Sequence, residues 1–558
     1  MHGKAGPFRR WSPCLHTAAS GPPGKEPSFS HTPGSDFESK PIVRGHQESL
    51  DLIAILLVLA GFLLRLVLAW FTFLNPDEIL HYLLSDQTSL ALAYKASLTT
   101  AHPPLLIVLL YYWRMLGRSE WILRLPSLLA GTGFCWMMFI WLKKVASRWT
   151  ALTGLALLLF SPSLIHLSAE IRQYSFLLFF SASALYFLEC ALLKDSARLM
   201  LLSFVALYLS LLSHYSALIF ALTLAIYGLF RMYRATSARV AISWMFGQLV
   251  ALAVCGFLYA THISRLKASG LPHEIADTWL SNSIYHPSRD HLVIFVFRNT
   301  IRLFHFLFSQ GAIGAMGLLC FVIGVAGLWI GDHRSPGAPE KPSSRQIGLL
   351  LMVPFIVNWI LALAGPYPYG GTRHNVILAG FAMSGIAIGF SRWRGGGKWI
   401  KAFVLGLALL ACNLFPNPTG PYIQPKNQSK RLLEQSMQFV RQQVPRGSIL
   451  LTDNGGGLSL SYYLCRKRVV QYEHPFMPFF QSDCGDFRVI TPAPNFEALP
   501  DRATVESISF PQASPAGEIW FFQAGWIIDK EHNPQMLLQR IGCKDPRNFG
   551  HNILICQL

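Results

Sequence analysis

Long apolar runs separated by short charged tracts are the feature that most restricts how this chain can fold. The first run, residues 52–74, can cross a hydrocarbon layer of about 30 Å, which requires about 20 residues. Only 14% of the 558 residues are charged and 52% are hydrophobic. Soluble domains carry about 25% charged residues, so the sequence predicts a polytopic membrane protein.

Eleven apolar runs predict membrane-spanning helices. They are residues 52–74, 121–142, 150–168, 173–193, 199–213, 216–230, 242–262, 312–331, 347–364, 375–391 and 399–415. Two further apolar stretches, 103–113 and 291–308, are short or interrupted by arginines. We expect these two to lie flat at the membrane interface as amphipathic helices.

The position of the charges predicts the orientation. If the N-terminus lies inside, the inner segments carry 21 Lys and Arg against seven Asp and Glu. This excess accounts for most of the net charge of +18, so the charge does not indicate nucleic acid as a partner. Cytoplasmic loops are enriched in Lys and Arg, and we therefore expect a cytoplasmic N-terminus and an extracytoplasmic C-terminus.

The predicted fold is an all-α polytopic membrane domain of about eleven transmembrane helices plus interfacial helices, followed by a small C-terminal α/β domain. Residues 1–50 are expected to form a disordered cytoplasmic tail, 51–415 the membrane domain and 416–558 the extracytoplasmic domain. In the last of these, apolar periodicity predicts a helix over 427–443. Three short strands are expected at 448–452, 518–522 and 552–556, and Asp453 to Gly457 are expected to form a turn.

The ten cysteines show no metal-binding spacing. Five lie in apolar runs, where a thiol packs as a small hydrophobic group. Four others, Cys465, Cys484, Cys543 and Cys556, fall in the C-terminal domain and allow three disulfide pairings. Disulfides there require that this domain faces an oxidising compartment.

Two polar motifs follow the first predicted span on its outer side. Asn75-Pro76-Asp77-Glu78 contains paired carboxylates, which could supply a general base or could start a helix. His102 precedes two prolines and could contact a phosphate or cap a helix.

Three further motifs fall on the same outer side. Glu170, Arg172 and Tyr174 lie where one helix leaves the membrane and another enters, and the first two could pair with each other or contact a substrate. His214 and Tyr215 lie between two spans, where packing and ligand binding both remain open.

The last motif joins two glycines to Arg373 and His374. The glycines would let backbone amides approach an anion, and the two side chains would add charge-assisted donors. Together the five motifs place an acidic pair beside phosphate-type donors, which suits group transfer from a lipid-linked phosphate.

The order of these motifs resembles the GT-C superfamily of membrane glycosyltransferases, and within it the family of protein O-mannosyltransferases and the lipid A aminoarabinose transferase. The resemblance runs from about residue 51 to 415. The residues that carry it are Pro76-Asp77-Glu78 with Tyr82, His102-Pro103-Pro104-Leu105, Arg124-Leu125-Pro126-Ser127, Glu170-Ile171-Arg172-Gln173-Tyr174, Ser213-His214-Tyr215 and Gly370-Gly371-Thr372-Arg373-His374.

The resemblance implies an inverting transfer from a polyprenyl-phosphate sugar on the outer face of the membrane, with a bacterial inner membrane as the location. It implies that Asp77 is the general base and that Glu78 holds the site or assists. Arg172 and Arg373 are the candidates for binding the donor phosphate, because a guanidinium fork suits phosphate oxygens. A metal cofactor is not required, since arginines can neutralise a monophosphate leaving group. Glycan, lipid and protein acceptors all remain open.

Two other functions compete with this one. A transporter or flippase of lipid-linked saccharides would place its polar site near the bilayer midplane on broken helices. An assembly subunit with a vestigial site would not need the Asp77 and Glu78 pair. The outer position of the motifs favours the enzyme.

Overall fold

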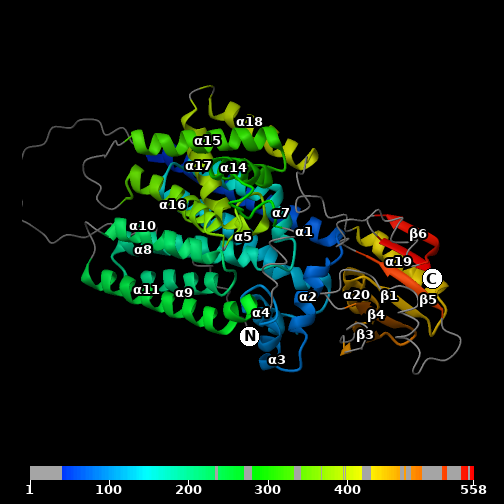
Figure 1. The fold of residues 1–558 in the computed structure, drawn as a ribbon. Helices are drawn as coiled ribbons and strands as arrows, with labels where there is room; N and C mark the ends of the chain where they lie inside the picture. Colours follow the sequence, from blue (N-terminus) through cyan, green and yellow to red (C-terminus); the bar gives the residue numbers. More distant parts are fainter. Residues whose placement is uncertain are drawn as a thin grey trace, which may run out of the picture.

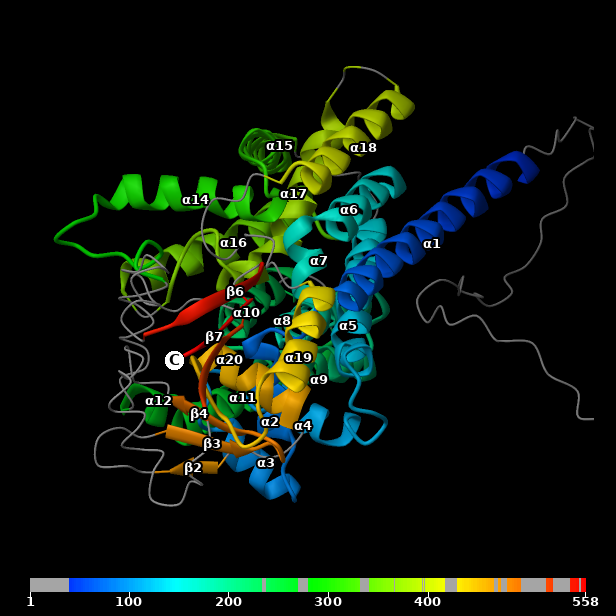
Figure 2. The ribbon, with the colours of Figure 1, turned by 90° about the vertical axis from the view of Figure 1, so that its right-hand side faces the viewer.

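The computed structural model describes residues 40–232, 237–268, 280–331, 341–365, 367–393, 395, 397–416, 429–465, 470–472, 479–492, 518–524, 542–550 and 553–558. Within these residues a bundle of long helices forms one part of the molecule and a mixed sheet forms the other. Figure 1 shows the sheet at one end of the bundle, beside α2. Figure 2 views the molecule from the sheet side, with α19 and the strands in front of the helices.

The helical part contains α-helices with two short irregular helices. Their bounds are α1 Lys40–Phe71, α2 Pro76–Ser85, α3 Leu90–Ser97, α4 Leu105–Trp113, α5 Glu120–Val145, α6 Arg148–Phe160, α7 Pro162–Ser168, α8 Tyr174–Lys194, α9 Ala197–Leu211, α10 Ala217–Met232, α11 Ala238–Leu258, η1 Tyr259–Ile263, α12 Ser264–Ala268, α14 Leu292–Phe308, α15 Gly311–Ile330, α16 Ser344–Leu363, η2 Arg373–Leu378, α17 Ala379–Arg392 and α18 Lys398–Leu414.

The described helices confirm a mostly helical polytopic membrane protein, with fewer full-length spans than the eleven predicted. Seven helices are long and apolar enough to cross a membrane, or eight if the bent pair α6 and α7 forms one span. The other three predicted spans correspond to α9, α10 and α18, which have 15, 16 and 17 residues. The stretches expected to lie flat form the helices α4 and α14.

The structure adds detail at two of the predicted segments. The predicted span 150–168 is bent by 60° between Phe160 and Pro162, where α6 ends and α7 begins. Proline lacks an N–H and disfavours helical geometry in the residue before it, so the helix breaks there. Helix α1 begins at Lys40, within the predicted tail 1–50, and residues 1–39 lie outside the described part.

The C-terminal part is a seven-stranded sheet in the order β2-β3-β4-β1-β5-β7-β6, with β1 parallel to β4 and β5 and the other pairs antiparallel. Its elements are α19 Lys430–Gln443, β1 Ile449–Thr452, α20 Asn454–Leu460, η3 Ser461–Cys465, β2 Val470–Tyr472, β3 Phe479–Asp483, β4 Arg488–Pro492, β5 Ile519–Gln523, β6 Lys544–Gly550 and β7 Ile553–Gln557. This confirms the predicted mixture of helix and strand. The three predicted strands are β1, β5 and β7: β1 starts one residue later than predicted, and β5 and β7 are each displaced by one residue.

The turn predicted at Asp453 to Gly457 is wrong, because these residues start α20. The Asp453 carboxylate accepts the Gly456 N–H at 2.6 Å and caps the helix. Aspartate is a favoured N-cap residue, and this capping outweighs the low helix propensity of three consecutive glycines.

The two parts of the molecule share a hydrophobic core. Phe73, in the linker between α1 and α2, is fully buried among Leu433, Met437 and Phe522 of the C-terminal part. Gly455 of α20 lies against Pro76, since a Cβ at this glycine would approach the proline Cγ to 3.4 Å. The start of α2 is therefore held by both parts.

Two disulfides join Cys465 to Cys484 and Cys543 to Cys556. They are the pairings closest in sequence among the three that the sequence allowed. Cys135, Cys190, Cys255, Cys320 and Cys412 are free thiols in the described helices.

Candidate active site

The start of α2 carries the paired acids and is fixed by a reciprocal cap. Asn75 Oδ1 accepts the Glu78 N–H at 3.1 Å, and Glu78 Oε2 accepts the Asn75 N–H at 2.9 Å. Pro76 occupies the first helical turn, where its missing N–H costs no helical hydrogen bond. This capping box gives Asp77 and Glu78 different surroundings.

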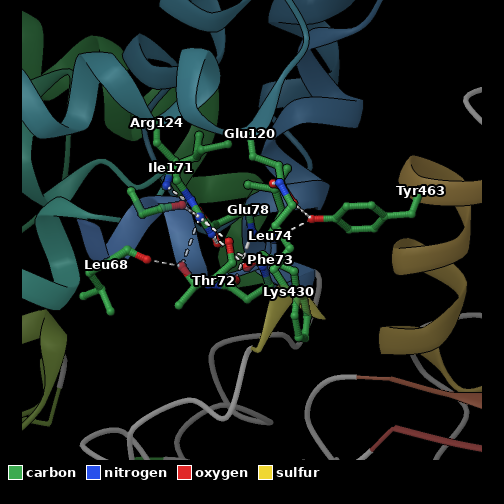
Figure 3. A network of polar contacts seen from close by, with 12 residues as sticks. Leu68, Thr72, Phe73, Leu74, Glu78, Glu120, Arg124, Ile171, Lys430 and Tyr463 are labelled. Carbon is green, nitrogen blue, oxygen red and sulfur yellow. Dashed lines mark hydrogen bonds and ion pairs between the residues drawn. The ribbon is translucent and has the colours of Figure 1, made fainter. Parts of the chain in front are cut away.

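Glu78 is fully buried and holds three chain segments together (Figure 3). Arg124 of α5 donates from Nε to Oε1 at 2.8 Å and from Nη2 to Oε2 at 2.7 Å. The same guanidinium donates to the carbonyls of Ala69, Thr72 and Phe73 at 2.7–2.8 Å. Glu78 Oε1 also accepts the Ile171 N–H at 2.9 Å. The Glu78 carboxylate has no solvent-exposed surface, and its role in holding the site stays a prediction that these contacts support.

Asp77 faces two guanidinium groups. Its Oδ2 lies 2.8 Å from Arg172 Nη2 and 3.1 Å from Arg373 Nη1. The Asp77 side chain is 24% exposed, whereas those of Arg172 and Arg373 are 2% and 12% exposed. Because Glu78 binds the residue before Arg172, the buried Glu78 carboxylate also fixes the separation of Asp77 from Arg172.

Four imidazole rings and one phenol ring lie together beside these arginines. The ring centroids of His102 and His214 are 5.4 Å apart, and His81 lies 6.2 Å from His102. Tyr174 lies 5.1 Å from His214, and His374 lies 5.9 Å from His214. We call Asp77, His81, His102, Arg172, Tyr174, His214, Arg373 and His374 the Asp77 cluster.

Several polar groups of this cluster are buried without a protein hydrogen-bond partner among the described residues. They include the Nε of Arg172, the hydroxyl of Tyr174 and the Nδ1 atoms of His81 and His102. Both polar atoms of the neighbouring Gln173 amide are in the same state. Buried polar groups are normally satisfied, so this concentration of unsatisfied donors is typical of a site that binds a polar ligand.

His81, His102 and His214 lie outside the membrane spans, and their surroundings lower the pKa of each imidazole, which favours the neutral form. Burial, with a further contribution from Arg172, lowers the pKa of His214 to about 3 and that of His81 to about 3. Burial and the neighbouring His214 lower the pKa of His102 well below its ordinary value. The contacts of His214 agree, because its Nδ1 accepts the Ser216 N–H at 3.1 Å and therefore carries no proton.

Protein stability is expected to fall as the pH drops below about 6.5, the ordinary pKa of an unfolded histidine. Between about 3 and 6.5 the unfolded chain binds more protons at His81 and His214 than the folded chain, so acid favours unfolding. Each histidine contributes a slope of about 1.4 kcal/mol per pH unit in that range. Melting temperatures of His214→Gln and of the exposed control His291→Gln between pH 7.5 and 5 test this. An unchanged slope in His214→Gln would contradict it.

The structure brings together most of the residues singled out in the sequence, with three differences. Tyr215 contacts His262, a residue outside the cluster, and its hydroxyl is 2.5 Å from His262 Nδ1. Glu170 is buried, and its backbone carbonyl accepts the Arg172 N–H at 2.8 Å. Arg172 has its ion pair with Asp77, so the alternative pairing with Glu170 is not the one found.

The two glycines before Arg373 serve close packing against α14. A Cβ at Gly371 would lie 2.3 Å from the Arg302 carbonyl oxygen, and Gly370 has a φ of +139° with Asn299 Oδ1 2.8 Å from its Cβ position. Glycine is needed at both positions for these reasons. Packing against α14 thus explains both glycines and sets the position of Arg373, and the approach of their amides to an anion stays a prediction.

Two residues of the site were not predicted. His81 follows Asp77 by four residues, a spacing that places both on one face of α2. Arg124 belonged to a quoted motif but had no assigned role. One sequence signal does distinguish the two acids, namely the capping-box spacing from Asn75 to Glu78. This spacing predicts that the Glu78 side chain accepts the backbone N–H of Asn75 at the helix start, whereas Asp77 has no such partner in the motif.

The C-terminal part also contacts the linker between α1 and α2, which leads directly to Asp77. The Tyr463 hydroxyl accepts the Leu74 N–H at 2.7 Å and donates to the Glu120 carboxylate (Figure 3). Lys430 Nζ lies 2.5 Å from the same carboxylate. Among the described residues, no group of three or more His, Cys, Asp or Glu side chains could hold a metal ion.

Residues 101–259 match the family model described as dolichyl-phosphate-mannose-protein mannosyltransferase. No curated protein matches the chain significantly.

Among solved structures, the chain is similar to ArnT from Cupriavidus metallidurans in the apo state, at 12% identity and a TM-score of 0.48 over 90% of this chain and 97% of that one. The same protein bound to undecaprenyl phosphate matches at 11% identity and a TM-score of 0.48 over the same shares. The Archaeoglobus fulgidus oligosaccharyltransferase AglB, in complex with an inhibitory peptide and a dolichol-phosphate, matches at 11% identity and a TM-score of 0.39 over 73% of this chain and 63% of that one.

The family match covers His102, Glu170, Arg172, Tyr174, His214 and Tyr215 of the predicted site. It confirms the resemblance predicted from the motifs. Residues 101–259 of this integral membrane protein carry the sequence pattern of the lipid-phosphate-dependent mannosyltransferase family of glycosyltransferases.

Proposed function

We propose that this chain transfers a sugar from a polyprenyl-phosphate donor to a hydroxyl group of an envelope glycan, lipid or protein, with inversion at the anomeric carbon. The observation that carries the proposal is the position of Asp77 between Arg172 and Arg373, surrounded by buried donors without protein partners. A base and a set of phosphate donors thus occupy one site.

The reaction needs a base and a stabilised leaving group. The acceptor oxygen forms a bond to the anomeric carbon while its proton passes to Asp77. The bond from that carbon to the phosphate oxygen breaks, and the electron pair leaves with polyprenyl phosphate. The leaving group gains one negative charge, which the guanidinium groups of Arg172 and Arg373 stabilise. Attack from the face opposite the phosphate produces inversion.

The neutral histidines suit the region around a sugar. An uncharged imidazole both donates and accepts a hydrogen bond, so His81, His102 and His214 can bind sugar hydroxyls without adding charge. The charge that neutralises the phosphate then comes from the two arginines. This division assigns the phosphate to Arg172 and Arg373 and the sugar to the histidines.

We further propose that the N-terminus is cytoplasmic and that residues 416–558 form an extracytoplasmic domain. The excess of Lys and Arg in the predicted inner segments supports this orientation. The two disulfides of the C-terminal part also support it, because disulfides persist in oxidising compartments. Helix α2, which carries Asp77, lies at the end of the bundle next to the C-terminal part (Figure 1), and so the Asp77 cluster would face outward.

The test supplies purified protein with polyprenyl-phosphate sugars and measures the release of free polyprenyl phosphate. We expect release by the parent, and a donor Kd at least about tenfold weaker in Arg172→Ala, since hydrogen bonds to charged groups are worth about 1.5–3 kcal/mol. Arg289→Ala, which removes an exposed guanidinium outside the cluster, is the matched control and should bind the donor as the parent does. No release with any donor would instead favour a transporter of lipid-linked saccharides.

A further inference from the structure

Two adjacent cavities lie where the C-terminal part meets α1 and α5. The first has a volume of about 590 Å³ and is lined by residues of α1, α2, α5, α19 and η3. The second has a volume of about 480 Å³ and is lined by α1 and α5. Trp70 and Trp121 line both cavities, so the two spaces share a wall.

The first cavity is polar and rich in aromatic rings. Tyr82, Tyr462 and Tyr463 line it together with the two tryptophans. The rings of Tyr82 and Tyr462 are 5.3 Å apart and almost perpendicular. The Tyr82 hydroxyl donates to Asp86 at 3.4 Å and the Tyr462 hydroxyl donates to the Arg118 carbonyl at 2.5 Å, so each hydroxyl oxygen keeps lone pairs that can accept from a ligand. Such rings offer apolar faces for the C–H groups of a sugar and hydroxyls for its oxygens.

The charges of the first cavity are already paired. Asp86 lies 2.9 Å from Arg114 and 3.7 Å from Arg118. Glu120 lies 2.5 Å from Lys430. The acids that line the cavity, which include Glu434, outnumber its lining bases, so it does not favour an anionic headgroup. A neutral headgroup with many hydroxyls fits these surroundings better.

The second cavity is lined entirely by apolar side chains. Phe62, Leu66, Phe71 and Leu125 belong to the ends of α1 and α5, both of which are candidate membrane spans. Trp70 is 58% exposed and Trp121 is 42% exposed at the junction with the polar cavity. Tryptophan is enriched at membrane interfaces, so the apolar cavity lies where a lipid chain would begin.

These cavities are separate from the Asp77 cluster. No residue of the Asp77 cluster lines either cavity. On a helix of 3.6 residues per turn, Tyr82 lies about 140° around α2 from Asp77 and about 100° from His81, and Asp86, which also lines the polar cavity, lies on the side of Tyr82. A ligand in the cavity therefore cannot be the phosphate that contacts Arg172 and Arg373.

We propose that the two cavities form one binding site for a membrane lipid with a neutral saccharide headgroup, with the sugar among Tyr82, Tyr462 and Trp121 and the chain between α1 and α5. Because its walls come from both parts of the molecule, the bound lipid also joins the C-terminal part to the membrane helices. The site does not depend on the proposed transfer reaction.

The test uses native mass spectrometry of the full chain in phosphatidylcholine nanodiscs, with monoglucosyl diacylglycerol as the probe. We expect a retained adduct with the glycolipid and a higher melting temperature. Diacylglycerol, phosphatidylethanolamine and free maltose should each bind at least about tenfold more weakly, because each lacks the sugar or the chain. Equal binding of phosphatidylethanolamine or diacylglycerol would overturn the saccharide assignment.

Variants locate the site. Trp121→Ala and Tyr462→Ala should each weaken glycolipid binding about threefold to tenfold, since an aromatic contact is worth about 0.5–1.5 kcal/mol. Trp399→Ala, which removes an exposed tryptophan of α18, should bind as the parent. Asp77→Asn should also bind as the parent, which separates this site from the transfer site. Parent-like binding by folded Trp121→Ala and Tyr462→Ala would contradict the proposal.

Discussion

Asp77→Asn is expected to lower the release of polyprenyl phosphate by at least about 100-fold. A positioned general base contributes about 10²–10⁴-fold to a reaction rate, and the amide of Asn cannot accept the proton. The substitution keeps the shape of the side chain and leaves Arg172 and Arg373 in place. Rates of release under saturating donor measure the effect on the chemical step.

The binding of the donor distinguishes this effect from a general loss of structure. Asp77 Oδ2 contacts both guanidinium groups, so removing its charge also removes an anion that competes with the donor phosphate. We therefore expect the donor Kd of Asp77→Asn to be equal to or tighter than that of the parent. The matched control is Asp51→Asn, because Asp51 pairs with Lys143 at 2.6 Å on α1 and α5 away from the cluster. Parent-like release by Asp77→Asn would rule out Asp77 as the base.

It could be predicted from the sequence that the site residues lie close together, because each motif lies beside an end of an apolar run. Helices that cross the same membrane bring their ends to one of two surfaces, so a charge-based orientation selects which motifs can meet. The same argument could not separate Asp77 from Glu78. That distinction depends on Arg124, which lies 46 residues beyond Glu78 and forms its ion pair only after α5 has packed against the α1–α2 linker.

Other parts of the site depend on contacts that no local pattern records. Tyr463 reaches the backbone of Leu74 across 389 positions of sequence, and Phe73 enters the core of the C-terminal part. The glycine pair at 370–371 packs closely against α14, a neighbour that its local pattern does not identify. In contrast, the break at Pro162 follows from local chemistry and could have been predicted.

Arg124→Met is expected to be among the most destabilising substitutions in the chain. It leaves the fully buried Glu78 carboxylate without its cation, and breaking a buried ion pair costs about 3–5 kcal/mol. The carbonyls of Ala69, Thr72 and Phe73 lose a donor at the same time. We expect a clear fall in the melting temperature of the purified protein. We also expect the α1–α2 linker, which positions Asp77 at the start of α2, to lose its ordered conformation.

The double variant Glu78→Gln with Arg124→Met tests the electrostatic origin of this loss. Removing both charges avoids a buried unpaired carboxylate, so the double variant should be more stable than Arg124→Met alone. Lys143→Met is the matched control, because it breaks a partly exposed ion pair that α5 makes with α1 and should cost about 0–1 kcal/mol. If Arg124→Met loses no more stability than Lys143→Met, the hydrogen bonds and ion pair between Glu78 and Arg124 do not hold the site. Retained folding with weakened transfer in the double variant would instead assign the network to the positioning of Asp77, since Glu78 also fixes the segment that presents Arg172.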